Sequence, residues 1–300
     1  MSLSRLPRFQ RSSDAPAFQL TERDVQILRL VYRHRFLRSS HICALVPGST
    51  QQVLRRLKLL YHNGYLTRPR AQIDYYHHGG SNVMVYCLGR HGAALLKNEL
   101  GPMFRFVPWD EDDNSDRRVF LKHALLVSDI VVSIELACRQ NGIRLLAEQD
   151  LAKANQPFRW KMNVQGQRFS VAPDRVFALE FTGSDGNIQR SYFFLEADRG
   201  TMPVTRKTLS QSSFYRKLLA YEATWAQAIH EKNFGFNRFR VLTVATSPER
   251  VKSLIEACSR LKTGHGLFLF TDTKILERPA QILSHICQAG RTGQTGTILG

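Results

Sequence analysis

The chain has 300 residues, of which 43% are hydrophobic and 22% charged, a balance typical of a protein that folds around an apolar core. Its 42 Lys and Arg outnumber 25 Asp and Glu, which gives a formal net charge of +17. No apolar stretch is long enough to span a membrane, no signal peptide is evident, and the five scattered cysteines form no CxxC pair. We therefore expect a cytoplasmic protein without a zinc site or a disulfide framework.

The positive charge is concentrated in the first third of the chain. Residues 1–110 contain sixteen Lys and Arg against six Asp and Glu. Such an excess favours a polyanionic partner, and nucleic acid is the first hypothesis because no basic amphipathic helix or lipidation motif indicates a membrane. The alternative is a basic surface that only keeps the protein soluble.

Three helices are predicted in this first third. Thr21, with Asp24 three residues later, is typical of a helix start, and apolar residues at helical spacing follow. A short second helix is predicted over residues 39–46, and a third over residues 51–61. Gly64 tolerates the left-handed conformation that ends the third helix.

A β-hairpin is predicted next, with strands near residues 65–70 and 83–88. Three helices followed by a hairpin form a winged helix-turn-helix, whose third helix enters the major groove of double-stranded DNA. We assign no metal chemistry to the two histidines at the hairpin tip, His77 and His78. The alternative function of such a module is binding to another protein. The candidate DNA-binding residues are the polar residues on the outer face of the third helix and two arginines of the hairpin, Gln51, Gln52, Arg55, Arg56, Lys58, Arg68 and Arg70.

An acidic polar segment at residues 110–117 separates two regions of different pattern. Because it has few apolar side chains and repels itself, we predict that it is an exposed linker. The predicted domains are therefore a winged-helix DNA-binding domain at residues 18–109 and a second domain at residues 118–285.

The second domain alternates helices and strands. The predicted order is αβββαβ with a mixed sheet, so the fold class is α+β or α/β with an N-terminal winged helix-turn-helix. The predicted helices cover residues 119–140, 205–231 and 248–262, and the predicted strands cover residues 143–147, 168–172, 175–181, 191–197, 239–245 and 266–270.

Two acids lie at the ends of predicted strands. Asp174 lies between two strands, and Glu196 closes an apolar strand. A buried carboxylate is costly unless it is paired or bound to a cation, so two such acids on neighbouring strands could hold one Mg²⁺. In the structural alternative, Asp174 caps a turn and Glu196 pairs with Arg199 or Lys217.

These acids carry a resemblance to a known superfamily. Pro173-Asp174 followed by Glu196-Ala197-Asp198 resembles the PD-(D/E)xK nucleases, although Asp198 stands where that motif places lysine. The resemblance implies a nuclease-like second domain, with a lysine supplied from the next helix, where Lys217 and Tyr221 share one face. The implied catalytic residues are Asp174, Glu196, Asp198 and Lys217, and the implied Mg²⁺ ligands are Asp174, Glu196 and Glu148.

The chain as a whole resembles the replication-relaxation family over roughly residues 18–245. The resemblance depends on the order of its motifs and implies a protein of a plasmid or other mobile element, with a role in replication or DNA relaxation. It does not by itself imply cleavage. The motifs are Leu20-Thr21-x-Arg23-Asp24, Leu88-Gly89-x-x-Gly92, Pro173-Asp174, Glu196-Ala197-Asp198-Arg199-Gly200-Thr201 and Lys217-x-x-x-Tyr221.

Three functional hypotheses follow. The first is a sequence-specific double-stranded DNA-binding protein that forms a homodimer, associates with the nucleoid or a plasmid, and works with replication or relaxation proteins. The second is a Mg²⁺-dependent DNA endonuclease or nickase. The third is a winged-helix transcriptional regulator whose second domain dimerises.

Overall fold

The computed structural model describes residues 8–15, 17–73, 83–101, 104–106, 108–109, 115–151, 158–183 and 186–299. The chain divides into two compact units, Met1–Val132 and Ser133–Gly300. The division falls within helix α5 (Ser115–Gln140), further along than the acidic segment, whose residues 110–114 lie outside the described residues. Leu121 and Leu125 of α5 pack into an apolar cluster of the first unit.

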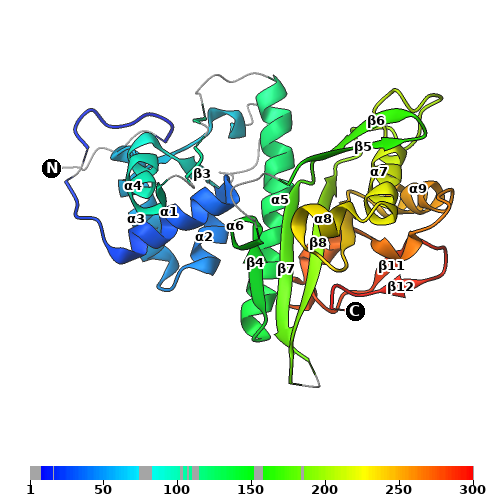
Figure 1. Ribbon diagram of the computed structural model, residues 1–300. Helices are drawn as coiled ribbons and strands as arrows, with labels where there is room; N and C mark the ends of the chain where they lie inside the picture. Colours follow the sequence, from blue (N-terminus) through cyan, green and yellow to red (C-terminus); the bar gives the residue numbers. More distant parts are fainter. Residues whose placement is uncertain are drawn as a thin grey trace. The chain divides into compact units, whose positions relative to one another are not determined.

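The first unit combines helices with a small antiparallel sheet of strand order β1-β3-β2 (Figure 1). The three predicted helices are present, and the predicted hairpin has its strands as β2 and β3. The two-residue strand β1 was not predicted. The elements are α1 (Glu22–His34), β1 (Leu37–Arg38), α2 (Ser39–Leu45), α3 (Thr50–His62), β2 (Leu66–Thr67), a 3₁₀ turn η1 (Arg70–Gln72), β3 (Val85–Leu88) and α4 (Arg90–Leu100). The hairpin tip, with His77 and His78, lies outside the described residues.

Local side chains fix the starts and ends of these helices as predicted. The backbone N–H of Thr21 donates to Asp24 Oδ2 at 2.8 Å, which caps α1. Ser49 Oγ accepts a hydrogen bond from the backbone N–H of Gln52 at 3.3 Å, which caps α3. Gly64, with φ of +76°, turns the chain away from the end of α3.

The Leu88-Gly89-x-x-Gly92 motif has a packing explanation. A Cβ atom on Gly89 or Gly92 would collide with the backbone carbonyl oxygens of Gly64 and Tyr65. Only glycine allows the start of α4 to lie this close to the turn after α3.

The second unit is built on a seven-stranded mixed sheet of order β12-β11-β10-β9-β8-β7-β4 (Figure 1). Strands β8, β9 and β10 run parallel, and the remaining neighbours pair antiparallel. The strands of this sheet are β4 (Arg144–Ala147), β7 (Arg175–Thr182), β8 (Ile188–Asp198), β9 (Arg240–Ala245), β10 (Phe268–Asp272), β11 (Cys287–Ala289) and β12 (Thr295–Gly296). The mixed α+β fold expected from the sequence is therefore confirmed.

A separate two-stranded sheet joins β5 (Trp160–Val164) to β6 (Gln167–Val171). Strand β6 was predicted near residues 168–172, but it pairs with β5 and not within the large sheet. This hairpin packs against α7 (Phe214–Ala226). Figure 1 shows α7 beside α9 (Pro248–Cys258), with which it is in contact.

The long helix predicted over residues 205–231 is wrong. Helix α7 begins only after Ser213, whose Oγ accepts from the backbone N–H of Arg216 at 3.3 Å. It ends before Ala228, which has φ of +53°, and the short α8 (Ile229–Phe234) follows. The cap at Ser213 and the positive φ at Ala228 divide the apolar pattern into two helices.

The core of the second unit is rich in aromatic side chains. Phe194 of β8 lies 4.9 Å from Phe239 and 5.2 Å from Trp160, measured between ring centroids. Tyr221 of α7 lies 5.7 Å from Phe194 and is also buried. Burial of these rings places α7 against β8, and the site described below lies at this contact. In the described parts of the chain, every helix is too short or too polar to span a lipid bilayer.

Candidate functional site

The outer face of α3 is exposed and polar except for Leu54, whereas its inner face is buried. Val53, Leu57 and Leu60 point into the first unit and have no exposed surface. The spacing of these residues leaves the opposite side of the helix to solvent, as predicted. The exposed members of the predicted DNA-binding set are Gln51, Gln52, Arg55, Lys58 and, on η1, Arg70.

Arg56 is different from its neighbours on α3, because its side chain is engaged inside the first unit. Its guanidinium forms a two-pronged ion pair with Asp24 of α1, with Nε donating to Oδ1 at 2.9 Å. Arg56 also donates to the backbone carbonyl of Gln19 at 2.8 Å. Asp24 is 0% exposed, so Arg56 compensates a buried charge that would otherwise be very costly.

Arg68 is also held by internal contacts. Its guanidinium lies 3.9 Å from the ring centroid of Tyr61 and 5.3 Å from that of Tyr86, and donates to Tyr86 Oη at 3.2 Å. A second donor reaches the backbone carbonyl of Arg8 at 2.6 Å. This stacking between two tyrosines stabilises the first unit and engages the Arg68 guanidinium in internal contacts, whereas Arg70 is exposed.

A buried ion pair connects β8 to α7 in the second unit. Glu196 is 2% exposed, and its Oε2 accepts from Lys217 Nζ at 2.5 Å. Its other oxygen, Oε1, accepts from Tyr221 Oη at 2.6 Å. The prediction that Lys217 and Tyr221 share one helical face is confirmed, since both reach the same carboxylate.

The protonation of this cluster follows from its burial. Burial raises the pKa of Glu196, an effect that Lys217 opposes and Asp174 reinforces. Burial alone would lower the pKa of Lys217, but attraction to Glu196 and then to Asp174 outweighs it, so that pKa is raised. The pKa of Tyr221 is raised far above its usual range by burial and by the neighbouring Glu196. The lysine is therefore charged and the tyrosine is a hydrogen-bond donor.

Asp174 lies beside Glu196 on the neighbouring strand end, as predicted. Its backbone N–H donates to the carbonyl of Leu195 at 3.0 Å, and its Oδ2 accepts from the backbone N–H of Ala197 at 2.8 Å. Two acids that are distant in the sequence thus lie at one edge of the sheet, and Asp174 contributes to the pKa of Glu196.

Asp198 has a structural partner that the sequence did not indicate. Its Oδ2 accepts from Arg250 Nε at 2.6 Å, and its Oδ1 accepts from the backbone N–H of Gly200 at 3.0 Å. Arg250 also donates to the carbonyl of Met202 at 2.6 Å. These contacts tie the loop after β8 to α9, and the charge of Asp198 also contributes to the raised pKa of Lys217.

Glu148 lies at the start of the short helix α6 (Glu148–Leu151), where its Oε1 accepts from the backbone N–H of Val176 at 3.0 Å. The described residues contain no group of three or more His, Cys, Asp and Glu side chains that could hold a metal ion. Glu148, Asp174 and Glu196 are thus not gathered into such a group in this structure. Lys217 already pairs with Glu196, and binding of Mg²⁺ at Asp174 and Glu196 stays a prediction.

Sequence reasoning missed Thr243, which pairs in register with Glu196 on the neighbouring parallel strand β9. Thr243 is 0% exposed, and its hydroxyl has no hydrogen-bond partner among the described residues. The sequence did contain a signal for Thr243, since it is a polar residue within the otherwise apolar run Val241–Ala245.

Tyr221→Phe should lower the free energy of unfolding by about 2 kcal/mol, because it removes a hydrogen bond to a buried carboxylate. Urea unfolding measures this change. Tyr215→Phe on the same helix is the matched control, since the Tyr215 hydroxyl bonds to no described residue, and we expect it to change stability by less than about 0.5 kcal/mol. Equal stability of the two variants would contradict the role given to Tyr221.

The fold and the site define a two-unit α+β protein with a basic helical surface and a buried acid–lysine pair at a sheet edge. The model of the replication-relaxation family matches residues 28–238, well over half of the chain. The chain belongs to the replication-relaxation family. Comparisons with curated proteins and with solved structures found no match.

Proposed function

We propose that this protein binds double-stranded DNA through its first unit, during replication or relaxation of a plasmid or other mobile element. The family to which the chain belongs points to a role in replication or relaxation. The observation that carries the proposal is the exposed face of α3, where Gln51, Gln52, Arg55 and Lys58 are free of the buried contacts that hold Arg56.

The order of elements in the first unit supports the same proposal. Helices α2 and α3 and the antiparallel sheet β1-β3-β2 follow the order expected of a winged helix-turn-helix, in which the second of two adjacent helices enters the major groove. Amide and guanidinium groups can form paired hydrogen bonds with adenine and guanine edges, respectively. Gln51, Gln52 and Arg55 are therefore the proposed base-contacting residues, and Lys58 and Arg70 the proposed phosphate contacts.

The second unit supports binding more than cleavage. Both oxygens of Glu196 already accept hydrogen bonds, one from Lys217 and one from Tyr221. A carboxylate held in this way stabilises the contact between β8 and α7. We propose that the second unit keeps a nuclease-like sheet edge as a structural element.

Selection of bound duplexes from a randomised pool tests the proposed role of α3. The wild-type protein should enrich a defined sequence, and Arg55→Ala should relax one position of it and weaken binding by about 5- to 150-fold. Lys58→Ala should weaken all duplexes to a similar extent without changing the selected sequence. Lys97→Ala, on the exposed side of α4, is the control and should change neither quantity. Selection unaffected by Arg55→Ala would contradict the proposal.

Incubation of supercoiled plasmid with the protein and Mg²⁺ tests whether the second unit cleaves. We expect binding without nicking. Nicking that is lost in both Asp174→Ala and Glu196→Gln would support an endonuclease in place of a DNA-binding protein. The Tyr215→Phe variant serves as a control for the preparation.

A further inference from the structure

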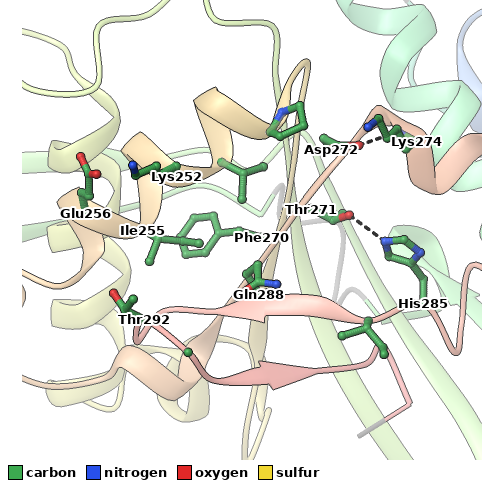
Figure 2. Close-up of a pocket in the computed structure, with 14 residues that line it drawn as sticks. Lys252, Ile255, Glu256, Phe270, Thr271, Asp272, Lys274, His285, Gln288 and Thr292 are labelled. Carbon is green, nitrogen blue, oxygen red and sulfur yellow. Dashed lines mark hydrogen bonds between the residues drawn. The ribbon is translucent and has the colours of Figure 1, made fainter.

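Two pockets of the second unit differ in the charge of the residues that line them. One, of about 490 Å³, lies between α9, β10 and β11 and mixes Lys252 and Lys274 with Glu256 and Asp272 (Figure 2). Phe270 and Ile255 form an apolar part of its lining. Figure 2 shows two hydrogen bonds here, one between Thr271 and His285 and one from the backbone N–H of Lys274 to Asp272. This balance of charge indicates no particular ligand.

The second pocket, of about 620 Å³, is strongly basic. It lies at the start of β9, beside the end of α7, and three arginines line it: Arg190, Arg238 and Arg240. The described residues that line it include no Asp or Glu. Its volume is in the range of pockets that hold a nucleotide-sized ligand.

The three arginines differ in how many contacts they form with other residues of the protein. Arg190 donates to Glu180 Oε2 at 2.7 Å, and Arg240 donates to the backbone carbonyl of Thr297 at 3.0 Å. Arg238 is exposed, and it forms no ion pair with any described residue. The partner of Arg240 is an uncharged backbone carbonyl and not a carboxylate. At least two guanidinium groups are thus left to bind an anion such as phosphate.

An aromatic ring borders the same pocket. Trp225 of α7 is 37% exposed, although most rings of this unit are buried. The indole stacks on His230, with ring centroids 4.9 Å apart and an angle of 13° between the planes, and the ring centroid of Phe239 lies 5.9 Å away at an angle of 65°. These contacts orient the indole, and part of it stays exposed to solvent.

We propose that this pocket binds single-stranded DNA, with a base stacked on Trp225 and the adjoining phosphates held by Arg238 and Arg240. Exposed aromatic rings beside cationic side chains are the arrangement by which proteins hold single strands without reading their sequence. The site goes beyond the proposed duplex binding by α3, since it lies in the other unit and takes an unpaired strand. A protein that acts in replication or relaxation would meet such strands where the duplex opens.

Fluorescence anisotropy of a labelled oligo(dT), about ten nucleotides long, tests the proposal in the full-length protein. Trp225→Ala should weaken binding by about 5- to 150-fold, and Trp225→Phe should retain most of the affinity because it keeps a stacking ring. Arg238→Ala should weaken binding and reduce its salt dependence, and its exposed position makes a folding defect unexpected. Lys252→Ala, in the mixed-charge pocket, is the control and should leave the affinity unchanged.

Three outcomes would overturn the proposal. The first is oligo(dT) binding that Trp225→Phe, Trp225→Ala and Arg238→Ala all leave unchanged. The second is an equal loss of duplex and single-strand binding in Arg238→Ala, which would indicate a general basic surface. The third is competition by thymidine monophosphate at equal nucleotide concentration, which would identify a site for a free nucleotide. Arg55→Ala should affect duplex binding alone, so failure of this site is distinguishable from failure of the proposed function.

Discussion

Arg56→Met should lower the free energy of unfolding by about 3 to 5 kcal/mol, whereas Arg55→Ala should change it by less than about 0.5 kcal/mol. The two arginines are adjacent on α3, but only Arg56 reaches the fully buried carboxylate of Asp24. Removing Arg56 leaves that carboxylate without its cation. Urea unfolding of both variants measures the difference, and equal effects would contradict the assignment.

The loss of unfolding free energy in Arg56→Met should depend on pH, because it depends on the ionisation of Asp24. Burial would raise this pKa, but hydrogen bonds from Arg56 and Thr21 outweigh burial and hold it below the ordinary value. A depressed pKa contributes stability that is present above the pKa of the unfolded chain and lost as the pH falls through that of the folded protein. The difference between wild type and Arg56→Met should therefore shrink in acid. A difference that grows as the pH falls would contradict this account.

Lys217→Met should destabilise the protein by about 3 kcal/mol at neutral pH, because it leaves the carboxylate of Glu196 buried without its cation. The value is at the lower end of the range for broken buried pairs, since the Lys217 side chain is 36% exposed and water partly solvates it. Urea unfolding measures this loss.

Protonation of Glu196 should reduce the loss of stability in Lys217→Met. Its pKa is already raised by burial, and removal of Lys217 raises it further, so the folded variant binds a proton that the unfolded chain does not. The stability of Lys217→Met should rise, relative to wild type, as the pH falls through the raised pKa of Glu196.

The double variant Glu196→Gln/Lys217→Met is the control for this interpretation. Its neutral amide needs no cation, so it should recover part of the stability and lose the pH dependence. A loss that is the same at every pH, or a double variant no more stable than Lys217→Met, would contradict a buried ion pair.

Local signals in the sequence predicted much of the fold. Thr21 with Asp24, Ser49 and Gly64 mark helix ends through hydrogen bonds and backbone angles that depend on nearby residues only. Strand β5 was missed, although Trp160–Val164 alternates buried and exposed side chains in the manner of a half-buried strand. The pattern was available, but its five residues gave a weak signal.

The partners of charged side chains could not be predicted in the same way. The periodicity of α3 places Arg55 and Arg56 on polar positions, but it does not show that Arg56 meets Asp24 of another helix. Asp198 likewise meets Arg250, which lies far along the chain. The pairing of Glu196 with Lys217 was one of two structural alternatives, and only the fold selects it over Arg199. The homodimer and the sequence specificity stay predictions.

The salt dependence of duplex affinity tests the central claim, DNA binding by the exposed face of α3, most directly. Each phosphate contact releases counterions and contributes about 0.9 to the slope of log affinity against log salt concentration. We predict that Lys58→Ala lowers this slope by about one relative to wild type, while Lys97→Ala leaves it unchanged. A slope that Lys58→Ala does not alter would place the DNA elsewhere on the protein and contradict this account.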